Sequence, residues 1–60
     1  MKMVATATYK DGTTKQRKAG YDESRDWVRY HSIRGLLERQ LFLDGNSKDI
    51  VSIKVELVRG

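Results

Sequence analysis

The 60-residue chain contains no cysteine and no proline, and it has a single histidine. Without cysteine it can form neither a disulfide nor a cysteine-based zinc site, and His31 alone cannot hold a zinc ion. A chain this short buries only about 60% of its unfolded surface, so self-association is the remaining way to reinforce a small core. The lack of cysteine also fits a reducing compartment, and we expect a cytoplasmic protein.

Long apolar runs are missing as well. No stretch approaches the ~20 apolar residues of a membrane span. Residues 1–8 alternate apolar residues with threonine, unlike the continuous apolar segment of a signal peptide. There is also no low-complexity linker and no internal repeat. We therefore expect no membrane association and a single small domain spanning residues 1–60.

Acidic residues are scarce in the first third of the chain. Residues 1–20 carry five Lys or Arg and one acid, Asp11, whereas residues 21–60 carry seven basic and seven acidic side chains. The formal net charge of +4 therefore lies on one segment. The phosphates of a nucleic-acid backbone attract clustered positive charge. The concentration of the net charge in residues 1–20 therefore favours nucleic acid as the partner.

The basic segment is also a predicted β-hairpin over residues 3–19, because Asp11-Gly12 stands between two strand-like runs. A two-residue loop would pair Thr8 with Lys15, which places Lys15 on the solvent face and Lys18 toward the helix. Lysine and arginine neutralise phosphates, and threonine hydroxyls hydrogen-bond to them. The predicted nucleic-acid-binding residues are Lys10, Lys15, Arg17, Lys18, Thr6 and Thr8.

A helix is predicted over about residues 22–43. Asp22 or Ser24 would serve as its N-cap, and Gly45 is a stop signal. At 100° per residue one stripe of apolar side chains forms the expected core face, namely Tyr30, Ile33, Leu37 and Leu41. An alternative is that residues 40–43 form a short strand paired with the last strand.

A second apolar stripe on this helix is the predicted protein interface. It consists of Val28, His31, Gly35 and Phe42. Glycine in a helix interior costs about 1 kcal/mol relative to alanine, which favours the close approach of another element at Gly35. A homodimer or another protein would use this stripe. The plainer alternative is that part of it packs under the loop after Leu43.

The last strand is predicted over residues 50–58. Val51, Ile53, Val55 and Leu57 alternate with polar residues. A right-handed crossover from the hairpin through the helix would place this strand beside the first one. The sequence thus predicts an α+β fold of ββαβ order: a three-stranded antiparallel sheet, order 2-1-3, with one helix packed across one face and an open apolar edge at the third strand.

Catalytic and metal-binding patterns are absent. The single histidine and the four serines are scattered, so we expect no catalytic residues and no enzyme. The acids at residues 22–26 complement a helix dipole better than they bind a metal. Residues 44–49 do not fit a calcium loop, because Lys48 and Asp49 occupy its fifth and sixth positions. No cofactor and no metal are expected.

A basic hairpin followed by a helix is similar to the arm-type DNA-binding modules of phage integrases. That family places three strands before the helix, whereas one hairpin precedes it here, so no residue role is transferred. The small undivided chain also resembles accessory proteins of bacteriophages and mobile elements. The leading hypothesis is therefore a non-enzymatic nucleic-acid-binding protein. The alternative is a protein-binding inhibitor or adaptor that uses the second helix stripe or the third-strand edge.

Overall fold

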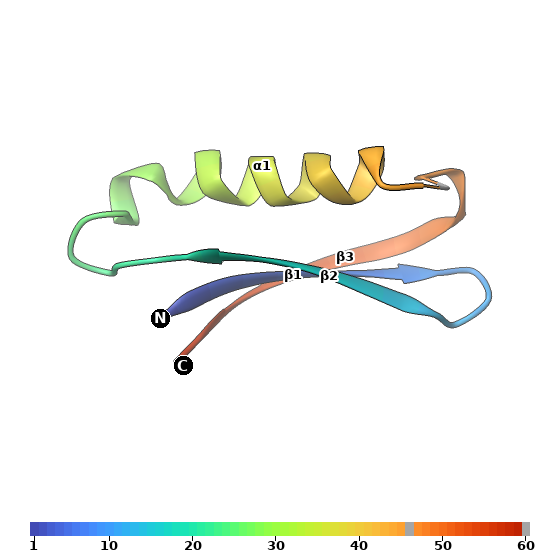
Figure 1. Ribbon diagram of the computed structural model, residues 1–60, viewed down its shortest axis with the longest axis horizontal. Coiled ribbons are helices and arrows are strands. Elements are labelled where there is room, and N and C mark those ends of the chain that lie inside the picture. The colour runs from blue at the N-terminus through green and yellow to red at the C-terminus, as the bar shows by residue number, and fades with distance from the viewer. Residues whose placement is uncertain (46, 60) are drawn as a thin grey trace.

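The computed structural model describes residues 1–45 and 47–59. Its elements follow in the order β1 (Lys2–Tyr9), β2 (Thr14–Gly20), the 3₁₀ turn η1 (Trp27–Arg29), α1 (Tyr30–Leu43), the 3₁₀ turn η2 (Ser47–Asp49) and β3 (Ile50–Val58). The strands form one antiparallel sheet in the order β2-β1-β3, and α1 lies across one face (Figure 1). The predicted ββαβ fold and its strand order are confirmed.

The core lies between β1 and α1. Every second residue of β1 points toward the helix, and Met3, Ala5 and Ala7 have no exposed surface. From the helix, Leu37 and Leu41 are buried against them, and Tyr30 and Ile33 pack at the margin of the cluster. The predicted core stripe of the helix is therefore confirmed. Because alanine side chains are short, the helix backbone can approach the central strand closely.

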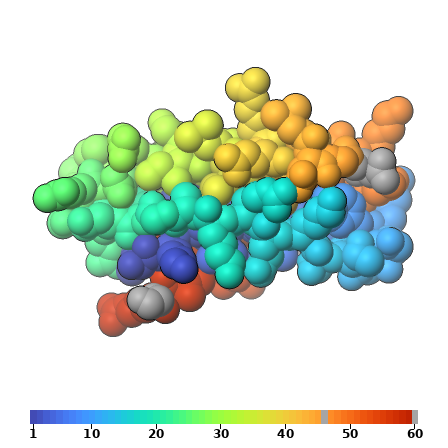
Figure 2. Space-filling view, viewed as in Figure 1, coloured from blue at the N-terminus to red at the C-terminus, as the bar shows by residue number. Residues whose placement is uncertain are grey.

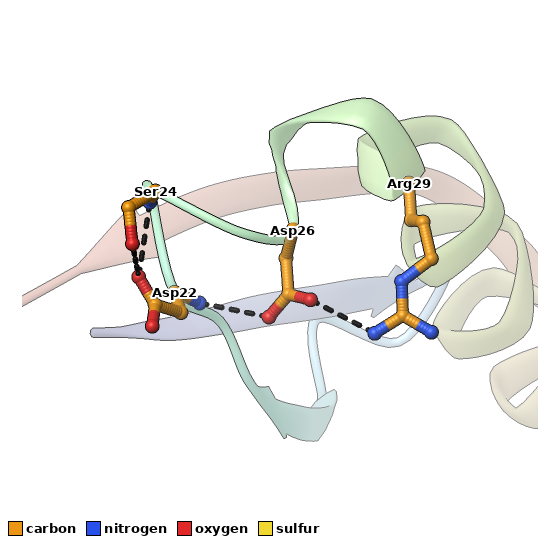
Figure 3. Close-up of polar contacts among 4 residues, drawn as sticks. All are labelled: Asp22, Ser24, Asp26 and Arg29. Atoms are coloured by element: carbon orange, nitrogen blue, oxygen red, sulfur yellow. Dashed lines mark hydrogen bonds and ion pairs between the residues drawn. The ribbon is translucent and has the colours of Figure 1, made fainter.

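The helix begins later than the sequence predicts. The carboxylate of Asp22 accepts hydrogen bonds from the backbone N–H and the hydroxyl of Ser24, at 2.9 and 2.7 Å (Figure 3). Asp26 accepts one from the backbone N–H of Asp22, at 2.9 Å. Short polar side chains that bond to nearby backbone groups compete with helix formation. Residues 22–26 therefore form a turn in place of the first helical turn, and α1 starts at Tyr30.

This turn is joined to the helix by an ion pair. The Arg29 guanidinium donates to the Asp26 carboxylate at 2.8 Å, and this bond lowers the pKa of Asp26 below its usual value. The hydroxyl of Ser24 likewise lowers the pKa of Asp22. At its other end α1 extends to Leu43, as the helix prediction has it. The alternative of a short strand over residues 40–43 is therefore wrong.

The hairpin register is shifted by one residue from the prediction. Thr8 opposes Thr14, not Lys15. The loop has three residues, because Gly12 donates to the carbonyl of Tyr9 at 2.9 Å and Tyr9 donates to the carbonyl of Thr13 at 2.9 Å. Gly12 has a φ of 88°, as the bulge residue of a three-residue hairpin loop requires.

The Asp11 side chain favours this longer loop. Its carboxylate accepts hydrogen bonds from the hydroxyl and the backbone N–H of Thr13, at 2.6 and 3.0 Å, and they lower the pKa of Asp11. A one-residue shift turns every side chain of a strand to the opposite face. The predicted faces of β2 are therefore wrong: Lys15, Arg17 and Ala19 lie on the helix side, whereas Thr14, Gln16 and Lys18 lie on the open side.

Candidate functional site

Two of the predicted nucleic-acid-binding residues are held at the end of the helix. The Lys15 ammonium donates to the backbone carbonyl of Asp44 at 3.2 Å. The Arg17 guanidinium forms an ion pair with the carboxylate of the same residue. Cations are also favoured at a helix C-terminus by the helix dipole. Lys15 and Arg17 therefore connect β2 to the C-terminal end of α1. Part of the positive charge that the sequence prediction assigns to binding a partner is thus used within the fold.

The sheet face opposite α1 is open. In the described part of the chain no helix or strand covers this face. Its side chains are mostly hydroxyl, amide and lysine, and the Gln16 amide donates to the Thr6 hydroxyl across the strands at 3.2 Å. The members are Lys2, Val4, Thr6, Thr8, Thr14, Gln16, Lys18, Ser52, Lys54, Glu56 and Val58. We call this set the open face.

The open face is positively charged. It carries three lysines and one acid, Glu56, which lies 3.8 Å from the ammonium of Lys54. It has no aromatic side chain, so it can contact phosphates but offers no platform on which bases stack. Thr6, Thr8 and Lys18 of the predicted set lie here, whereas Lys10 lies in the hairpin loop. The prediction missed Lys2 and Lys54, although alternation along each strand places them on this face.

Large apolar side chains are exposed on the outer surface of the helical segment, among exposed polar ones such as Ser32 and Arg39. Trp27, Val28, Leu36 and Leu43 are 66%, 65%, 60% and 74% exposed. In the space-filling view, side chains of α1 project from the upper surface of the molecule (Figure 2). We call the exposed apolar side chains of η1 and α1 the helix surface: Trp27, Val28, Leu36, Phe42 and Leu43. The sequence prediction included Val28 and Phe42 but missed Trp27, Leu36 and Leu43, and the seven-residue spacing of the two leucines is a usable signal.

Gly35 lies in the middle of the helix surface. Apart from its chain neighbours and the adjacent backbone of its own helix, a Cβ built at Gly35 would meet no described atom within 4 Å. The close approach of another element that this glycine predicts therefore does not occur within the described chain. His31 is exposed, and its ring stands edge-on to Tyr30 with centroids 5.5 Å apart. Their place at the surface is compatible with an interface, and the interface itself stays a prediction.

A shallow hollow of about 350 Å³ opens at the hairpin end of the molecule. Its lining includes two lysines and two aspartates, so it favours neither a cation nor an anion. The lining residues are Tyr9, Lys10, Asp11, Thr13, Lys15, Gly45 and Asp49. The Tyr9 hydroxyl is buried and has no hydrogen-bond partner among the described residues. Nothing in this balance of charge selects a ligand.

Comparison of the chain with protein-family models, curated proteins and solved structures finds no match. Within residues 1–45 and 47–59, no helix has the length and apolar character needed to cross a membrane. In the same part of the chain, no three His, Asp or Glu side chains gather as a metal site would require. Function is therefore inferred from the surfaces described above.

Proposed function

We propose that this protein is a small non-enzymatic protein-binding module that presents its helix surface to another protein. The supporting observation is the exposure of five large apolar side chains on one short segment, with Leu43 at 74% and Trp27 at 66%. Isolated exposed apolar residues are ordinary, but a group of them on two consecutive elements of a small protein is typical of an interaction site. This choice places the protein-binding alternative ahead of nucleic-acid binding.

The helix surface has the layout of a helix that enters an apolar groove. Leu36 and Leu43 are seven residues apart and share one side of α1, Phe42 lies on a neighbouring stripe, and Val28 precedes the helix in η1. Gly35 lies on the second stripe and has open space above it. A partner backbone could approach the helix there without meeting a side chain, which gives this otherwise costly glycine a use.

The experiment places a photo-crosslinking residue at Leu36 or, as a control, at Thr14 on the open face. We expect a protein of the natural host to crosslink from position 36 and not from position 14. Leu36→Lys should then weaken binding to that protein by about tenfold or more, as truncation of an interface centre does. Thr14→Lys adds the same charge to the other face and should leave binding unchanged.

The proposal fails if crosslinking from position 36 gives no defined protein product. It also fails if Leu36→Lys and Thr14→Lys weaken binding equally, because the effect would then come from charge and not from the helix surface. Moderate salt should change the affinity little, since apolar burial is not screened.

Nucleic-acid binding through the open face is a second candidate, favoured by the three lysines that share this face. Binding to a short duplex should weaken with salt by a logarithmic slope of about 0.9 per neutralised phosphate. Lys18→Ala should reduce the magnitude of that slope by about 0.9, which is the contribution of one phosphate contact. Lys15→Ala is the matched control, because Lys15 is on the same strand but donates to Asp44 at 3.2 Å on the other side.

Two results would remove this second candidate. One is that neither a short duplex nor a single strand binds at low salt. The other is that Lys15→Ala and Lys18→Ala reduce the salt slope equally, because the faces of β2 would then not distinguish them.

A further inference from the structure

The two edge strands of the sheet, β2 and β3, differ in the features that discourage pairing with another chain. β2 carries three basic side chains in seven residues, Lys15, Arg17 and Lys18. β3 has nine residues, no proline and two charged side chains, Lys54 and Glu56. Charge, proline and short length are the usual protections of an edge strand against pairing with another chain. In the described chain β3 pairs on one side alone, with β1, and its other side forms the sheet edge (Figure 1).

The hydrogen bonds of Tyr9 determine which residues of β3 direct their backbone N–H and carbonyl groups out of this edge. Its N–H and its carbonyl both bond within the hairpin, so the odd-numbered residues of β1 face β2. The even-numbered residues of β1 therefore face β3, where Thr8 opposes Ser52. On β3 it follows that Ile53, Val55 and Leu57 direct their backbone N–H and carbonyl groups away from β1.

We propose that β3 pairs antiparallel with β3 of a second copy of this chain, about a two-fold axis at Val55. In this register Ile53 opposes Leu57 of the second copy, so the outward backbone groups meet each other. Lys54 opposes Glu56 of the second copy, and by symmetry the same pair forms twice. An axis at residue 54 or residue 56 would instead oppose like charges, which is destabilising.

The pairing joins two three-stranded sheets into one sheet of six strands. The two-fold axis is perpendicular to the sheet, so both α1 helices lie on the same face. α1 packs mainly against β1 and β2. The apolar side chains of the two β3 strands, including Leu57, which is 40% exposed in the single chain, would gather between the helices. The dimer thus presents two helix surfaces side by side. The proposal of a dimer does not depend on the proposed function.

The experiment measures solution mass by sedimentation equilibrium over a range of protein concentrations. We expect the wild-type chain to dimerise reversibly. Lys54→Glu and Glu56→Lys should each weaken the dimer about tenfold or more, because each substitution turns two attractive cross-strand pairs into repulsive ones. An equimolar mixture of the two variants should dimerise like the wild type, since the new acid of one chain opposes the new base of the other.

The mixture separates pairing between chains from effects within one chain. Lys54 and Glu56 of the same strand are 3.8 Å apart, and each variant loses that contact alone and in the mixture. Lys18→Glu is the control, because it makes the same charge change on the same face but on β2. A chain that is monomeric at millimolar concentration overturns the proposal. A dimer insensitive to both charge reversals, or a mixture that stays dissociated, overturns the register.

Discussion

Leu41→Ala is expected to unfold a large fraction of the protein under native conditions. Leu41 has no exposed surface and belongs to the cluster formed by α1 and β1. Truncation of such a leucine costs about 2–5 kcal/mol, because the lost transfer free energy adds to the cost of the cavity. A 60-residue domain has a free energy of unfolding of roughly 3–9 kcal/mol in total. The substitution therefore removes much of the stability, and urea titration followed by far-ultraviolet circular dichroism measures the loss.

Leu43→Ala is the matched control for this prediction. It is the same substitution two residues further along α1, at a side chain that is 74% exposed. Its free energy of unfolding should change by less than about 0.5 kcal/mol, as is usual for surface positions. If the two variants lose similar stability, the orientation of the helix on the sheet is wrong.

The pair Leu41 and Leu43 also shows which parts of the fold can be predicted from sequence. The period of 3.6 residues distinguishes the two leucines without knowledge of the sheet, because one lies in the stripe with Leu37 and the other does not. The alternation of β3 is equally local, and it assigns Ile53 and Val55 to the helix side correctly. The handedness of the crossover then determines the strand order.

The hairpin register could not be read from the sequence in the same way. Asp11-Gly12 is compatible with both a two-residue and a three-residue loop, and both loops use the glycine at a positive φ. The two hydrogen bonds from Thr13 to the Asp11 carboxylate accompany the longer loop, and they depend on geometry that the pattern does not contain. An error of one residue in the loop was enough to reverse both faces of β2.

The contacts of Lys15 and Arg17 with Asp44 could not be predicted from the sequence for a different reason. Their partner, Asp44, lies at the far end of the helix, and the Lys15 contact spans 29 positions in the sequence. Charge segregation along the chain shows where cations are concentrated, but it does not show which of them the fold itself neutralises. Of the helix surface only Val28 and Phe42 were predicted, because Trp27, Leu36 and Leu43 fall outside the stripe that contains Gly35.

Ala5→Leu is the second substitution with a large expected effect. Ala5 has no exposed surface at the centre of the middle strand, between Arg17 of β2 and Val55 of β3. A leucine side chain adds three carbon atoms where the helix lies close to the strand. Extra volume in a packed core typically costs 1–3 kcal/mol, because side chains or backbone must shift. We expect a clear fall of the urea midpoint.

Thr6→Leu tests whether this loss comes from the face or from the strand. Thr6 is the next residue of β1, so its side chain points to the open face, where the described chain leaves room above it. A leucine there meets solvent and the neighbouring Gln16, and it should change the free energy of unfolding by less than about 1 kcal/mol. A larger loss for Thr6→Leu than for Ala5→Leu would mean that the helix covers the opposite face. In that case, the assignment of Lys18 and Lys54 to an uncovered surface would fall with it.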